Sequence, residues 1–260
     1  MTQYKQPIRT LGLAVLLSVL GAGCATDVGV PARQTVSPFS TAQPGGALPP
    51  GWAPWSLTRF KKDTIYQLVA DPSGVTVIEA MSDQSASGLR KHLDIDPQML
   101  PWIHWRWLVP ALIPSADNAR RDLEDSPVRV VITFAGDIDK LDFEERALAA
   151  RTKALTGQAL PYATLMYIWE NRAPRDSVLV SHHTTRVKMI VAESGTRRSG
   201  DWVEFERNVV ADFERAFGEK PGRIKSLGIM TDTDNTGESA VAYYGDIRFT
   251  PVATQKGNIK

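Results

Sequence analysis

Residues 102–109, Trp-Ile-His-Trp-Arg-Trp-Leu-Val, decide the fold class of this chain. Ile103, Trp105, Trp107 and Val109 alternate with mostly polar residues, which is the period of a β-strand with one buried face. Further stretches combine this period with short apolar runs bounded by glycine or proline: residues 65–78, 128–134, 163–170, 187–192, 202–207, 226–231 and 240–249. Many short strands of this kind predict an all-β fold, an antiparallel β-sandwich of the jelly-roll type.

Two short helices are expected between the strands. Asp142 and Glu145 have the spacing of a capping box at the start of the first, and Gly157 ends it. Asn208 is the expected cap of the second, which Gly218 ends. Two helices are too few to cover a parallel sheet on both faces, so we expect them to be insertions into a sandwich.

The amino terminus has the three-part order of a secretory signal. Lys5 and Arg9 precede an apolar run over residues 11–20, and small residues then lead to Cys24. The run is too short to cross a bilayer, which needs about 20 residues. Cys24 is the single cysteine of the chain, so we predict a bacterial lipidation site and no disulfide. Because Leu20 lies one position further from the cysteine than this signal prefers, an ordinary cleaved signal is the alternative.

Composition divides the chain into four segments. Residues 1–23 are the predicted signal peptide, and residues 24–50, with five prolines, are a predicted tether after the lipidated cysteine. Residues 51–251 are the predicted β-sandwich domain, and residues 252–260 are a polar tail. Ala25 after the cysteine favours passage to the outer membrane. We therefore expect a lipoprotein of the bacterial cell envelope, anchored in the outer membrane and facing the periplasm.

The charge balance limits the classes of partner. The chain has 30 lysines and arginines against 29 aspartates and glutamates. No stripe of basic residues builds the field that nucleic acid requires, so we expect no nucleic-acid partner. The expected partners are the membrane, through the lipid anchor, and a saccharide or an envelope protein.

The strand that opens this section has a second face. Trp102, His104 and Arg106 point away from the expected core. Tryptophan stacks on the apolar faces of sugars, and arginine binds carboxylates with two parallel hydrogen bonds, so these three residues are candidate ligand contacts. The alternative is that another layer covers this face and that Arg106 pairs with an acid.

A polar stretch near the carboxyl terminus offers hard oxygen ligands. Asp232, Asp234, Asn235 and Glu238 are candidate ligand contacts, and Gly237 permits a sharp turn. The flanking segments are predicted strands, so this is not an EF-hand. We take Asp232 and Asp234 as a candidate calcium site and expect no other cofactor. The alternative is a hairpin loop in which these side chains bond their own backbone.

Two carboxylates on one strand are the candidate catalytic residues. Glu204 and Glu206 share a strand face, with Cβ atoms about 7 Å apart from the strand rise. Two carboxylates at such a separation can serve as acid and base on a glycosidic bond. The alternative is an ordinary solvent-facing strand. No nucleophile elbow, Walker motif or dinucleotide glycine pattern occurs in the sequence.

Five motifs occur in an order that resembles a bacterial family known only as a domain of unknown function. They are WRW at 105–107, VRVVITF at 128–134, ADFERAFG at 211–218, TDTDNTGE at 231–238 and YGDIRF at 244–249. This family implies no established activity, and the last motif resembles the closing strand of carbohydrate-binding jelly rolls. The hypothesis is an envelope lipoprotein that binds a saccharide or another envelope component without catalysis. The alternatives are a glycan-cleaving hydrolase or lyase that uses Glu204 and Glu206, and a structural lipoprotein that binds a protein partner.

Overall fold

The computed structural model describes residues 1–2, 34–56, 60–157 and 159–254. Cys24 and nearly all of the predicted signal peptide lie outside these residues, so the lipidation site stays a prediction. From residue 31 onward the chain forms one compact unit. Among the described residues, no helix has both the length and the apolar character needed to span a bilayer.

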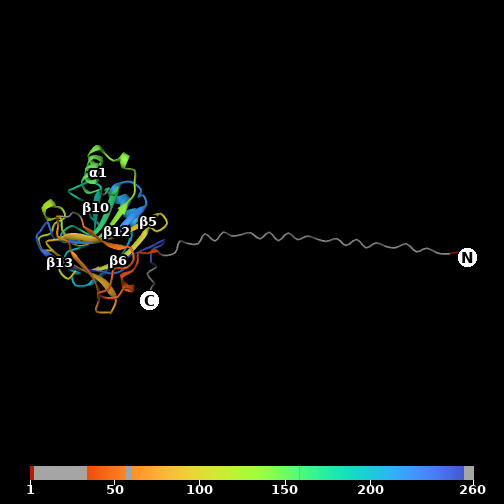
Figure 1. Ribbon diagram of the computed structural model, residues 1–260, viewed down its shortest axis with the longest axis horizontal. Coiled ribbons are helices and arrows are strands. Elements are labelled where there is room, and N and C mark those ends of the chain that lie inside the picture. The colour runs from red at the N-terminus through yellow and green to blue at the C-terminus, as the bar shows by residue number, and fades with distance from the viewer. Residues whose placement is uncertain (3–33, 57–59, 158, 255–260) are drawn as a thin grey trace. The chain divides into compact units, whose positions relative to one another are not determined.

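The described strands form two sheets of seven strands each (Figure 1). Sheet A has the spatial order β1 (Gln34–Thr35), β14 (Arg248–Thr250), β6 (Trp102–Leu108), β13 (Ser239–Tyr244), β4 (Thr76–Asp83) and β3 (Ile65–Ala70), and β11 (Trp202–Asn208) pairs with β6. Sheet B has the order β2 (Trp52–Ser56), β5 (Ala86–Ile95), β12 (Ile224–Asp232), β7 (Ser126–Phe134), β8 (Ala163–Glu170), β10 (Val187–Ser194) and β9 (Val178–Val180). The predicted all-β sandwich is confirmed.

One pair of strands departs from the predicted antiparallel arrangement. Among the pairings of the named strands in the described ranges, only β8 with β10 is parallel. The chain leaves β8, runs back through β9 at the edge of sheet B, and returns as β10 between them. The chain reverses direction between β8 and β9 and again between β9 and β10, so β10 runs in the same direction as β8.

The alternation in β6 places its tryptophans in the core between the sheets. Trp105 and Trp107 are 3% and 0% exposed. The Trp105 ring stacks on Tyr167 of β8 at 4.7 Å and on Phe205 of β11 at 4.9 Å, measured between ring centroids. Aromatic side chains bury the largest apolar areas, so this cluster joins the two sheets at their centre.

The two α-helices begin and end at the predicted residues. Asp142 accepts a hydrogen bond from the Glu145 N–H at the start of α1 (Phe143–Thr156), which lies at one end of the sandwich in Figure 1. The Asn208 side chain accepts from two backbone N–H groups at the start of α2 (Val209–Phe217). Gly157 and Gly218 both have the left-handed conformation that ends a helix. Three short 3-10 helices complete the described helical elements: η1 (Phe39–Thr41), η2 (Arg121–Leu123) and η3 (Ile138–Lys140).

Part of the predicted tether belongs to the folded domain. Val36 and Phe39 are 2% and 1% exposed, and the Phe39 ring lies 4.9 Å from the Trp52 ring. Strand β1 also pairs with β14. The segment predicted as a tether, residues 24–50, therefore includes residues that pack on the sandwich: Val36 and Phe39 are buried, and Ala42 and Leu48 pack against the core. Its composition does not reveal those contacts.

Candidate functional site

A groove of about 770 Å³ lies on sheet A, on the side away from the aromatic core. Strand β6 contributes His104 and Arg106 to its lining, and β11 contributes Glu204 and Glu206. These side chains alternate along the strands with the buried Trp105 and Phe205, so they point to the opposite face of the sheet. The groove therefore contains His104 and Arg106 of the predicted ligand face, and both candidate catalytic residues, Glu204 and Glu206.

Strand pairing brings these two sites together. In the antiparallel register of β6 with β11, Glu204 lies opposite Arg106 and Glu206 lies opposite His104. Side chains directly opposite each other have Cβ atoms about 4.5–5.5 Å apart. The candidate binding residues and the candidate catalytic residues thus form one cluster.

Arg106 is fixed in this cluster by three neighbours. Its guanidinium lies 4.2 Å from the centre of the Trp202 ring, and its Nη2 donates a hydrogen bond to Asp71 Oδ2 at 3.2 Å. Its side chain lies against the backbone at Gly245, where an added Cβ would come within 2.5 Å of Arg106 Cγ. Hydrogen bonds from Ser73, followed by the backbone and the charge of Arg106, lower the pKa of Asp71. Arg106 pairs with an acid, as the alternative held, and it still lines an open groove.

His104 and Glu206 contact each other across β6 and β11. His104 is 4% exposed; its Nδ1 lies 3.3 Å from Glu206 Oε2, and its Nε2 lies 2.7 Å from Thr250 Oγ1. The Thr250 hydroxyl donates its one proton to the Val252 carbonyl, so it accepts the N–H of His104 Nε2. The Thr254 N–H donates to the same Glu206 oxygen at 2.7 Å.

Glu204 has a different environment from Glu206. It is exposed, and in the described part of the chain it has no hydrogen bond or ion pair. Glu206 is instead half-buried and bonded to His104 and Thr254. Two carboxylates two residues apart on the same strand face therefore have different surroundings, Glu204 exposed and Glu206 in contact with His104 and Thr254.

The sequence predictions include one residue outside the groove and omit several that line it. Trp102 is half-buried at the start of β6 and is not among the lining residues. Trp202 is not among them either, but its ring contacts the lining residue Arg106. Asp246 and Arg248 line the groove from the YGDIRF motif, which was recognised without a site being assigned to it. Arg175 also lines it, from a loop after β8 that has no sequence signal.

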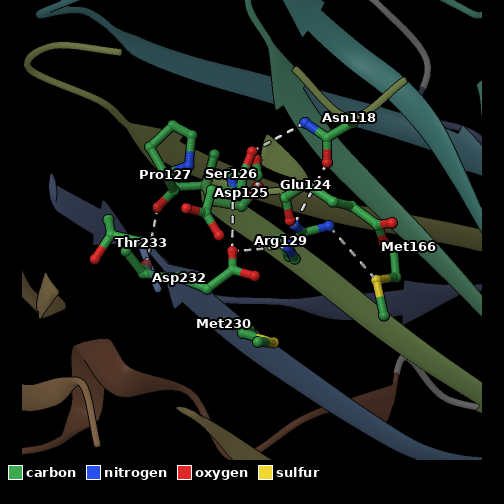
Figure 2. A network of polar contacts seen from close by, with 12 residues as sticks. Asn118, Glu124, Asp125, Ser126, Pro127, Arg129, Met166, Met230, Asp232 and Thr233 are labelled. Atoms are coloured by element: carbon green, nitrogen blue, oxygen red, sulfur yellow. Dashed lines mark hydrogen bonds and ion pairs between the residues drawn. The ribbon is translucent and has the colours of Figure 1, made fainter. Parts of the chain in front are cut away.

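The Asp-rich stretch is in a different place. Asp232 ends β12 in sheet B, where Arg129 Nε donates to Asp232 Oδ1 at 2.9 Å and the Ser126 N–H donates to the same oxygen. Figure 2 shows Arg129 directed between Asp232 and the sulfur of Met166. Burial raises the pKa of Asp232 from 3.8 to about 6, against the lowering effect of Arg129. None of the candidate ligands at positions 232–238 lines the sheet A groove.

Three carboxylates gather at this stretch. Oxygens of Asp125, Asp232 and Asp234 lie within 4.8 Å of one another, a set that the hard-oxygen preference of calcium fits. Basic groups already contact two of them, since Lys61 pairs with Asp234 and Arg129 with Asp232. A calcium ion would have to replace the half-exposed Lys61 at Asp234.

The remaining polar groups of the stretch bond to a segment distant in sequence, residues 115–125. Asp125 accepts hydrogen bonds from the backbone N–H groups of Asn235 and Thr236 and from the Thr236 hydroxyl. Glu238 accepts from Ser115 Oγ at 2.7 Å and is not part of the carboxylate cluster. These contacts join the loop to residues 115–125 and not to its own backbone, so they do not reproduce the alternative of a self-bonded hairpin loop, and calcium binding stays a prediction.

Comparison with known proteins gives low structural similarity and no curated match. No curated protein matches this chain. The α-L-arabinofuranosidase MgGH51 aligns with a TM-score of 0.40 and 9% identity over 86% of this chain and 27% of that chain. Endoglucanase 3 of Trichoderma harzianum, from family GH12, gives a TM-score of 0.41 and 8% identity over 85% and 98% of the two chains.

A third similar structure is the adhesin domain of Lys-gingipain from Porphyromonas gingivalis. It has a TM-score of 0.34 and 12% identity, and covers 84% of this chain and 99% of that domain. The present chain spans about a quarter of the length of the arabinofuranosidase. TM-scores this low support no argument about function.

The family comparison is more informative than the structural one. The model of a protein family of unknown function, DUF3047, matches residues 50–248. The match runs from just before β2 to the first residue of β14 and so includes most of both sheets. It confirms the resemblance drawn from the five sequence motifs. The chain belongs to the DUF3047 family of proteins of unknown function.

Proposed function

We propose that the groove on sheet A binds a saccharide. The observation that carries this proposal is the convergence of Arg106 and His104 with Glu204 and Glu206 in one groove, beside Trp202. The groove volume falls within the range of about 300–1,000 Å³ that small-molecule sites occupy. Carboxylates, guanidinium groups and an indole are the groups that bond sugar hydroxyls and contact sugar faces.

We further propose that this domain is presented by a lipid anchor on the bacterial envelope. The support is the signal-like amino terminus with Cys24, the single cysteine. Expression in a bacterial host with radiolabelled palmitate, followed by membrane fractionation, tests this. The anchored protein incorporates label and sediments with outer membranes, whereas Cys24→Ala does neither. A wild-type protein that stays unlabelled and soluble in the periplasm refutes the anchor.

A glycan array tests the binding proposal. Wild-type protein is expected to bind a defined group of glycans, and Arg106→Gln and Glu204→Gln are expected to lose that binding. Arg90→Gln is a matched control, because Arg90 lies over Trp55 on sheet B and does not line the groove. A blank array for folded wild-type protein would refute saccharide binding and favour the structural, partner-binding lipoprotein.

Glycan cleavage is a second candidate function, favoured by the unequal states of the two glutamates. Pairs of titratable groups whose environments differ are the usual basis of an acid and base assignment. The half-buried Glu206, in contact with His104, would donate a proton to the leaving oxygen, and the exposed Glu204 would act as base or nucleophile. Incubation of a bound glycan with the protein tests this by assay of new reducing ends. Product that Glu204→Gln and Glu206→Gln both abolish supports cleavage, and a glycan of unchanged length refutes it.

A further inference from the structure

The groove has more basic than acidic side chains in its lining. Its arginines are Arg106, Arg175, Arg207 and Arg248, and its carboxylates are Glu204, Glu206 and Asp246. Carboxylates beside the groove pair with two of these arginines: Asp71 with Arg106, and Asp176 and Asp212 with Arg207. Binding of an anion therefore depends on the donors that individual arginines leave free, and not on an excess of positive charge.

Arg106 has the donors to recognise an anion. An arginine has five N–H donors, and within the described ranges the Arg106 guanidinium makes a single hydrogen bond, to Asp71. The guanidinium also lies 4.2 Å from the centre of the Trp202 ring, and its remaining N–H groups make no hydrogen bond within the described ranges. Gly245 and Trp202 hold the side chain in place, so little rotamer freedom is lost when a ligand binds.

Arg175 is the second available cation. Its side chain is 52% exposed, and its contact with Glu193 is long, at 3.8 Å. Arg207 is different, because Asp212 and Asp176 both bind its guanidinium. We therefore expect Arg106 to bind the anion, with the exposed Arg175 as a second contact.

Glu204 restricts the ligand further. It lies opposite Arg106 in the strand register and would repel a second acidic group placed beside the first. Its oxygens are free to accept hydrogen bonds from hydroxyls. The ligand that fits both residues presents a carboxylate to Arg106 and a hydroxyl to Glu204.

We propose that the ligand of the sheet A groove is an acidic saccharide, a glycan with uronic-acid units, whose carboxylate binds Arg106. This inference rests on the proposed function, since it names the chemical class of the saccharide. The carboxylate accepts parallel hydrogen bonds from the planar guanidinium, which is the strongest geometry of this pair. A hydroxyl on the same sugar bonds Glu204.

The test uses pairs of polymers that differ only in charge. Polygalacturonate, alginate and a glucuronate polymer are each compared with their own methyl-esterified form by calorimetric titration of the full chain. At least one acid form is expected to bind tenfold or more tightly than its ester, with an affinity that falls as salt rises. In Arg106→Gln the difference falls to twofold or less, and Arg106→Lys recovers part of it. Arg90→Gln keeps the full difference.

The outcomes separate the two proposals. Equal binding of acid and ester forms, or binding of neutral glycans only, overturns the acidic class and leaves saccharide binding standing. No binding of any polymer or array glycan overturns both. If Arg106→Gln fails to fold, as judged by its thermal melt, then Arg175→Gln takes its place. This variant changes an exposed side chain and is expected to weaken the acid form alone by about threefold.

Discussion

Replacement of Arg129 by methionine gives the sharpest test of how the sandwich is stabilised. Arg129 lies on β7 and is 3% exposed, and its Nε donates to Asp232 Oδ1 at 2.9 Å (Figure 2). Its other donors reach the Glu124 carbonyl at 2.8 Å and Met189 Sδ at 3.1 Å. The methionine side chain fills similar space without charge, so Arg129→Met leaves Asp232 buried without its basic partner.

The expected cost follows from the burial of this pair. Breaking a buried ion pair by removing one partner costs about 3–5 kcal/mol. Because the pKa of Asp232 is already about 6, the unpaired carboxyl takes up a proton at pH 7, which places the cost near the lower end, about 3 kcal/mol. A domain of this size changes its Tm by about 2–4 °C for each kcal/mol, so we expect a fall of about 6–12 °C.

A double-variant cycle isolates the pair. Urea unfolding at pH 7 is measured for wild type, Arg129→Met, Asp232→Asn and the double variant. The double variant removes both charges and retains the Ser126 N–H contact to the carbonyl oxygen, so it is expected to lose only about 1–2 kcal/mol. The exposed pair of Arg223 with Asp94 is the control, and its loss is expected to leave the unfolding midpoint unchanged. Single costs that simply add in the double variant would refute the reasoning.

Three further predictions concern pH, the amino-terminal segment and calcium. Because its pKa is raised in the folded state, the Asp232 carboxyl contributes stability below its unfolded pKa, and this contribution is lost as pH rises through 6. In urea unfolding, the stability of wild type relative to Asp232→Asn should therefore increase by about 1–3 kcal/mol from pH 7 to pH 4. An equal difference at both pH values would contradict the raised pKa. Phe39→Ala should lower the free energy of unfolding by about 3–5 kcal/mol in the same assay, since Phe39 packs on Trp52. A loss below about 1 kcal/mol would support the predicted tether instead. The predicted calcium site implies a higher Tm with calcium than with a chelator, and a rise that Asp234→Ala abolishes. An equal Tm would contradict the site and would mean that Lys61 and Arg129 already neutralise Asp234 and Asp232.

Much of the fold was predictable because strands such as β6 and β11 have one apolar face, whereas β7 is buried along its whole length. The alternation of residues 102–109 alone places Trp105 and Trp107 in the core. The helices were also predictable, since Asp142 and Asn208 cap them through contacts within a few residues. The parallel pairing of β8 with β10 was not, because pairing depends on contacts between segments distant in sequence.

The site was predictable in its parts but not as a whole. Arg106 and Glu204 could each be chosen from local patterns, whereas their meeting depends on the register of β6 with β11. The alternation of residues 128–134 places Arg129 away from the core, and it does not reveal that Asp232 and two methionines surround it there. Arg175 has no sequence signal at all, because its loop reaches the groove only through the folded structure.

The central claim is that the outer face of sheet A is the saccharide site. Amide hydrogen exchange of the protein, with and without the polymer that binds best, tests it most directly. Slower exchange confined to β6, β11 and the segment 245–248 is the predicted result. Slower exchange around the Asp232–Glu238 loop or around Trp55 on sheet B, with β6 and β11 unchanged, would contradict the claim.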